Sequence, residues 1–185
     1  IFTQYKAVAY SSDPEKFIDE IVEEAKIILN GKDSQETKAK KLSQIAVKTV
    51  DIKGLASYTL GKKRKEISSE ELKKYQVLFK QYFLKSFTSR LTDYSDPKIS
   101  VVSAETVNEK YTIVKTLLLK TNKKPEVKID WRVYTKDPDN PLIRDLIVEG
   151  LSLARTQKEE FASILNSNNN DINVLFKALE DFINK

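Results

Sequence analysis

One stretch near the carboxyl end, residues 141–165, constrains the fold of this chain more than any other. It begins with Leu142–Val148, a run too apolar on both faces for a solvated edge strand. Glu149 and Gly150 interrupt the run, and glycine in a strand often marks a bulge or a close approach of another group. The hydrophobic period then changes from two to 3.6 residues, with Thr156 as a plausible helix N-cap. This order predicts a junction where a sheet and helices enclose a space.

The first part of the chain predicts three helices. Ser12-Asp13-Pro14 is a helix start, because proline is favoured at the first helical position, and an apolar stripe continues from there to Gly31. A second helix is expected from Ser34, and a short third helix over residues 52–60. Residues before Tyr10 have no clear hydrophobic period, so we expect an extended lead-in there.

The longest helix is expected over residues 69–93. Residues 68–71, SSEE, form a capping box, in which the first serine and the last glutamate bind each other's backbone amides. One face of this helix is too bulky and aromatic for an exposed surface, so it covers a sheet or lines a pocket. The residues on this face are Leu72, Tyr75, Phe79, Tyr82, Phe83, Ser86 and Arg90.

Four strands are predicted after Pro97, because stretches of strand character are separated there by turn signals. Short connections between long strands indicate antiparallel pairing. Ile129, Trp131 and Val133 alternate with charged residues, which indicates one solvated face, whereas residues 111–119 are apolar on both sides. The predicted strands cover residues 98–104, 110–121, 126–135 and 142–150.

Helices, a sheet and helices again predict an α+β fold. We expect a four-stranded curved antiparallel sheet covered by a long helix and by further N- and C-terminal helices, with a cone-like shape and an apolar cavity. A chain of 185 residues can bury a real core as one domain. The expected parts of this domain, residues 1–185, are an N-terminal helical part (11–66), the long helix with the sheet (67–153) and the C-terminal helices (154–185).

The composition excludes several kinds of chemistry. The chain has no His and no Cys, which excludes histidine bases, His-ligated metals, thiol nucleophiles and zinc–thiolate sites. No stretch approaches the roughly 20 apolar residues that cross a bilayer. A net charge of +5 favours anionic partners. Because the first residue is Ile1 rather than Met, we interpret it as the start of a mature or trimmed chain, which is compatible with a removed export signal.

Three segments resemble one known family. They are residues 50–62 (VDIKGLASYTLGK), residues 68–95 (SSEELKKYQVLFKQYFLKSFTSRLTDYS) and residues 145–165 (DLIVEGLSLARTQKEEFASIL), with four strands before the last. In this order they are similar to the MlaC-type, toluene-tolerance auxiliary family of periplasmic phospholipid-binding proteins. The resemblance is most specific at Glu149-Gly150-x-Ser152-Leu153 and at FASIL. It departs at Arg64, where the family often has an aromatic residue.

The resemblance implies a soluble periplasmic carrier that holds the acyl chains of a phospholipid in its cavity. It implies that lipid passes between an outer-membrane lipoprotein and an inner-membrane ABC transporter complex with MCE domains, in the maintenance of outer-membrane lipid asymmetry. A monomer would serve this role. No catalytic residue, metal or cofactor is expected other than the bound phospholipid, and no nucleic acid partner.

The apolar strand faces, the aromatic helix face and the resemblance together predict the cavity wall. Leu151 follows Gly150 where the last strand gives way to helices, so its side chain is expected to face the cavity. The predicted lining residues are Leu78, Phe79, Tyr82, Phe83, Val114, Leu117, Trp131, Ile147, Gly150, Leu151, Leu153, Phe161 and Ile164.

Two other functional classes remain open. Asp145 and Glu149 lie four residues apart on one side of the last strand, where they could form the carboxylate pair of a small enzyme or a salt-bridged rim. The basic run KKRK at residues 62–65, together with eight tyrosines, could contact nucleic acid. Four charges in a loop are more often simply solvated, and the run could also lie near the cavity mouth and attract anionic headgroups or acidic surfaces.

Overall fold

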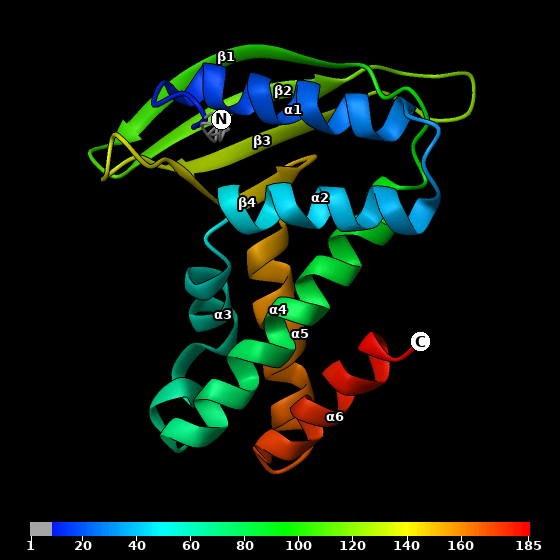
Figure 1. The fold of residues 1–185 in the computed structure, drawn as a ribbon. Coiled ribbons are helices and arrows are strands. Elements are labelled where there is room, and N and C mark those ends of the chain that lie inside the picture. The colour runs from blue at the N-terminus through cyan, green and yellow to red at the C-terminus, as the bar shows by residue number, and fades with distance from the viewer. Residues whose placement is uncertain (1–8) are drawn as a thin grey trace, which may run out of the picture.

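The computed structural model describes residues 9–185, and these form six α-helices and one five-stranded sheet (Figure 1). The lead-in expected before Tyr10 lies outside the described residues apart from Ala9. The helices are α1 (Pro14–Asn30), α2 (Gln35–Thr49), α3 (Ile52–Leu60), α4 (Ser69–Leu91), α5 (Leu153–Asn166) and α6 (Ile172–Ile183), with a 3₁₀ turn η1 (Gly61–Lys65) after α3. The strands are β1 (Ile99–Asn108), β2 (Tyr111–Leu118), β3 (Val127–Tyr134), β4 (Leu142–Val148) and β5 (Leu151–Ser152).

The helices begin where a side chain accepts hydrogen bonds from the backbone amides of the first turn. The predicted capping box of α4 is confirmed: the Ser68 amide donates to the Glu71 carboxylate at 2.8 Å, and the Glu71 amide donates to Ser68 Oγ at 3.2 Å. The predicted N-cap Thr156 is wrong, because the N-cap of α5 is Ser152, four residues earlier. Ser152 Oγ accepts from the Arg155 amide at 3.0 Å, and the Asp145 carboxylate accepts from the Ala154 amide at 3.0 Å. These two acceptors satisfy first-turn amides before the chain reaches Thr156.

The sheet is an antiparallel meander in the order β1-β2-β3-β4-β5, so it has five strands rather than the predicted four. The extra strand arises from the glycine break. Glu149 and Gly150 have φ values of +50° and +82°, and such a pair of left-handed residues makes a tight two-residue hairpin turn. The turn pairs Val148 with Leu151. Gly150 therefore turns the chain, and no other group approaches it closely.

The helices and the sheet form two hydrophobic cores. Helix α1 lies on β1 and β2, and together with α2 it builds the sheet-side core (Figure 1). The long helix α4 packs mainly on α2, α3 and α6, so it faces the sheet from a distance rather than lying on it. The helical core consists of residues from α3, α4, α5 and α6. None of the helices within residues 9–185 combines the length and the hydrophobicity needed to span a bilayer.

Candidate functional site

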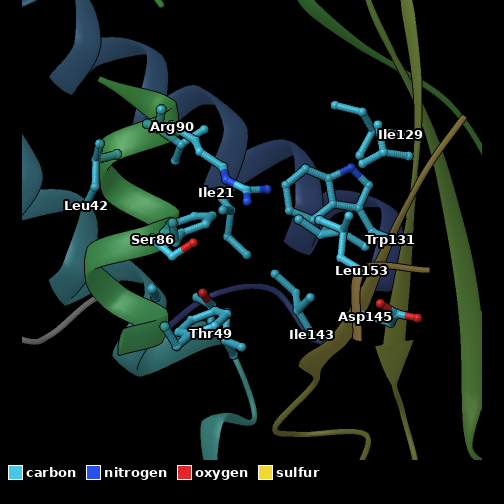
Figure 2. Close-up of a pocket in the computed structure, with 18 of the residues that line it drawn as sticks. Ile21, Leu42, Thr49, Ser86, Arg90, Ile129, Trp131, Ile143, Asp145 and Leu153 are labelled. Carbon is cyan, nitrogen blue, oxygen red and sulfur yellow. The ribbon is translucent and has the colours of Figure 1, made fainter. Parts of the chain in front are cut away.

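A cavity of about 520 Å³ lies between the two cores, within the range of 300–1,000 Å³ typical of ligand pockets. Helices α1 and α2 close one side, α4 and α5 another, and the inner face of the sheet a third (Figure 2). Most of the lining side chains are apolar. They include Ile21, Ala25, Leu42, Ile45, Leu55, Phe79, Phe83, Phe87, Leu118, Val127, Ile129, Trp131, Ile143, Leu146, Val148 and Leu153.

The face of α4 that lines the cavity is the aromatic face predicted from the sequence. Phe79, Phe83 and Phe87 follow one another at helical spacing, with stacked rings whose centroids are 6.2 and 5.9 Å apart. Such stacking holds the rings in one orientation, so α4 presents a continuous apolar wall. Tyr82, Ser86 and Arg90 continue the same surface toward the carboxyl end of the helix.

The buried polar groups of the wall have partners within the protein. Trp131 Nε1 donates to Thr116 Oγ1 at 2.9 Å, and this hydroxyl in turn donates to the Ile129 carbonyl at 2.8 Å. Tyr82 Oη donates to Gln157 Oε1 at 2.7 Å. Among the described residues, no buried side-chain nitrogen or oxygen lacks a hydrogen-bond partner. The buried interior therefore contains no unpaired polar group that a ligand would have to satisfy, and it favours an apolar ligand group.

Burial keeps the tyrosines of this region neutral. It raises the pKa of Tyr75, whose hydroxyl lies 2.8 Å from Thr59 Oγ1 beneath the cavity. Burial also raises the pKa of Tyr82, the charge of Glu160 adds to this rise, and the charge of Arg90 opposes it. The charges of Arg90 and Glu160 therefore act in opposite directions on the pKa of the Tyr82 hydroxyl.

Five of the predicted lining residues lie on the cavity wall: Phe79, Tyr82, Phe83, Trp131 and Leu153. The other eight lie elsewhere. Leu78, Phe161 and Ile164 pack in or against the helical core, and Val114 is buried under α1 in the sheet-side core. Leu117 and Ile147 are half-buried at strand positions that alternate with the cavity-lining Leu118, Leu146 and Val148, so they point to the other face of the sheet. Gly150 and Leu151 lie at the β4–β5 hairpin, outside the wall.

Leu151 was predicted to face the cavity rather than solvent, but its side chain is 67% exposed and does not line the cavity. The β4–β5 hairpin accounts for this. Leu151 follows the turn directly and pairs with Val148 at the end of the sheet, where its side chain is left open to solvent. Leu153, two positions later at the start of α5, is the leucine that reaches the cavity.

Sequence reasoning missed the contributions of α1 and α2 to the wall. These contributions come from Ile21, Ala25, Leu42 and Ile45, none of which is among the predicted lining residues. It also missed Ile129, although the strict alternation with Trp131 places both residues on one face of β3. That alternation was a signal that could have identified Ile129.

The carboxylates Asp145 and Glu149 are both engaged in holding the backbone. Asp145 accepts from the Ser152 hydroxyl and the Ala154 amide, and Glu149 accepts from the Lys128 amide at 2.5 Å. Asp145 is buried at the cavity wall, whereas Glu149 is exposed at the hairpin turn. Neither forms an ion pair within residues 9–185, so the salt-bridged rim does not occur there. Nor do the described residues hold a cluster of three metal-ligating side chains.

The basic run at residues 62–65 forms the turn η1 beyond the end of α3, and none of its residues lines the cavity. Arg64 donates to the Gly61 carbonyl at 2.8 Å, so it caps the end of α3. Lys63 lies 3.4 Å from Glu66. The run therefore contributes to local structure as well as to surface charge.

Comparisons with known proteins agree with this geometry. A search of the curated proteins found no match to the chain. Among solved structures, the phospholipid-binding protein from Ralstonia solanacearum, determined in complex with a phospholipid, superposes with a TM-score of 0.75 at 18% identity. The match covers 90% of this chain and 94% of that one. The family model described as "MlaC protein" matches residues 15–181. The chain thus belongs to the MlaC protein family.

Proposed function

We propose that this protein is a phospholipid carrier that holds acyl chains in the cavity between its two cores. The observation that carries the proposal is an apolar cavity of about 520 Å³, together with the finding that no buried side-chain nitrogen or oxygen of the described residues lacks a hydrogen-bond partner. Each CH₂ group that moves from water into such a cavity contributes about 0.8 kcal/mol. Membership of the MlaC family and the phospholipid in the similar Ralstonia protein support this choice of ligand.

The carrier acts in the periplasm and moves phospholipid between an outer-membrane lipoprotein and an inner-membrane ABC transporter complex with MCE domains. In this role it maintains the lipid asymmetry of the outer membrane, and family membership supports the assignment. It works as a monomer and needs no catalytic residue, metal, cofactor or nucleic acid. Its net charge of +5 favours encounters with acidic docking surfaces, which raises association rates more than affinity.

Native mass spectrometry of the protein purified without detergent tests the binding function. We expect a mass increase that matches one phospholipid per chain, and phospholipid in an organic extract of the same sample. Protein that stays empty after incubation with phospholipid vesicles would contradict the proposal. Transfer of a fluorescent phospholipid from donor to acceptor vesicles then tests carriage separately, because a protein that binds lipid without accelerating transfer is a store rather than a carrier.

A further inference from the structure

Four residues of the cavity wall carry a formal charge: Lys26, Arg90, Asp145 and Glu160. Three of them have polar partners within the protein. Lys26 lies 2.6 Å from Glu23, Asp145 accepts two hydrogen bonds, and Glu160 accepts from the Gln157 amide at 2.9 Å. Within residues 9–185, no carboxylate lies within ion-pairing distance of Arg90, and its guanidinium makes no side-chain hydrogen bond. Arg90 is thus the cation of the wall that has no counter-charge.

The position of Arg90 suits a ligand that is apolar at one end and charged at the other. It lies in the last turn of α4, two helical turns beyond Tyr82 and one turn beyond Ser86 on the cavity face. Figure 2 shows its side chain extending from α4 toward the wall that carries Trp131. The residue is exposed to solvent although it lines the cavity, so it stands at the mouth. The stacked Phe79, Phe83 and Phe87 extend away from it along α4.

The chemistry of the guanidinium selects the ligand group. Arginine presents a planar fork of N–H donors that binds two oxygens of one phosphate, and it stays charged at all relevant pH values. The carboxyl end of a helix carries a partial negative charge, which stabilises the cation in this last turn. A phosphodiester at the mouth would supply the missing counter-charge while its acyl chains enter the apolar interior.

We propose that Arg90 is the phosphate subsite of the cavity and fixes the orientation of the bound lipid, with the headgroup at the carboxyl end of α4. This inference rests on the proposed carrier function and adds a headgroup contact to it. The shared glycerol phosphodiester, rather than a particular headgroup alcohol, is the group recognised.

Isothermal titration calorimetry of the delipidated protein with two probes tests this assignment. The probes are dihexanoylphosphatidylcholine and dihexanoylglycerol, which have the same acyl chains and differ in the phosphate-containing headgroup. We expect the wild-type protein to bind the phospholipid about five- to tenfold more tightly than the diacylglycerol. In Arg90→Gln this preference should fall to less than about twofold, while the affinity for dihexanoylglycerol stays unchanged.

Two variants control for other roles of the arginine. Arg90→Lys keeps the charge at the end of α4 but loses the planar fork, so it should retain only part of the preference. Arg155→Gln removes the same charge from the exposed face of α5, outside the cavity wall, and should behave as the wild type. The wild-type preference should also weaken when the salt concentration rises from about 0.05 to about 0.5 M, because the mouth is open to solvent.

The possible outcomes separate the two proposals. If neither probe binds the wild-type protein, the carrier function itself fails. If both probes bind but Arg90→Gln keeps the full preference for the phospholipid, the phosphate subsite is overturned and the carrier function stands. Competition by inorganic phosphate alone at about 1 mM or less would assign Arg90 to a free anion and overturn the headgroup assignment, whereas absence of competition supports it.

Discussion

The two hydrophobic cores are built from the same kinds of residue, but they differ in how completely other elements enclose them. In the helical core, α3, α4, α5 and α6 pack around Tyr75 and Leu175, both 0% exposed, and the ring of Phe161 meets those of Tyr75 and Phe79 edge to face at 6.4 Å. The sheet-side core is closed on one face by α1 but faces the cavity on the other. The difference indicates a division of labour, in which the helical core carries stability and the gap between the cores receives the ligand.

The largest effect should come from truncation of the helical core. Leu175→Ala removes a side chain that is surrounded on all sides, and we expect a loss of about 3–5 kcal/mol in the free energy of unfolding. The matched change Leu42→Ala, at a residue 1% exposed that already borders the cavity, should cost at least about 1 kcal/mol less. Urea unfolding of the delipidated proteins measures both values. Equal losses would contradict the proposed difference between the cores.

Filling the gap should affect ligand binding rather than stability. Ser86 points into the cavity from α4 (Figure 2), so Ser86→Trp would place an indole where the acyl chains are expected. We expect at least a tenfold loss of phospholipid affinity, about 1.4 kcal/mol, with unchanged or increased stability. Ser89→Trp, on the exposed side of the same helix, is the control. Normal lipid loading of Ser86→Trp, measured by native mass spectrometry, would place the ligand elsewhere.

The pH dependence of stability should report on the helical core. Burial raises the pKa of Tyr75, so this hydroxyl stays protonated in the folded protein when the unfolded chain ionises near pH 10. Tyr75 makes its full contribution to the free energy of unfolding below about pH 10. Above about pH 10, the free energy of unfolding falls by about 1.4 kcal/mol per pH unit, because the unfolded chain loses the proton that the folded protein keeps. Tyr75→Phe should make this alkaline slope shallower, at a cost of about 1 kcal/mol at neutral pH for the lost contact with Thr59. Stability curves that stay parallel between pH 9 and about pH 11 would show that Tyr75 ionises freely.

The smallest effect is expected at the β4–β5 hairpin. Leu151 is 67% exposed and outside the wall, so Leu151→Glu should change the free energy of unfolding by less than about 0.5 kcal/mol and leave lipid loading intact. Leu153 is 38% exposed and lines the cavity, and Leu153→Glu should lower lipid loading because a carboxylate would lie beside the acyl chains. If Leu151→Glu loses lipid as severely as Leu153→Glu, the hairpin takes part in binding.

Local patterns predicted the elements and one side of the cavity. The capping box at Ser68 and the aromatic face of α4 follow from spacing within a single helix, and the structure places Phe79, Tyr82 and Phe83 on the wall. Other positions depend on contacts distant in sequence. Val114 is as apolar as its neighbours, and it belongs to the core rather than the cavity because α1 covers that part of β2. The orientation of Leu151 depends on a two-residue turn that adds a strand, and apolar periodicity alone does not reveal that turn.

The central claim is that the acyl chains occupy the gap between the two cores. Trp131 is the only tryptophan of the chain, and its indole lines this gap while its Nε1 is anchored on Thr116. Loading the delipidated protein with a phospholipid whose acyl chains carry bromine, a short-range quencher, therefore tests the claim directly. We predict that Trp131 loses most of its fluorescence at one lipid per chain, while the same phospholipid without bromine leaves it unquenched. Bound brominated lipid, verified by mass spectrometry, with full Trp131 fluorescence would contradict the account.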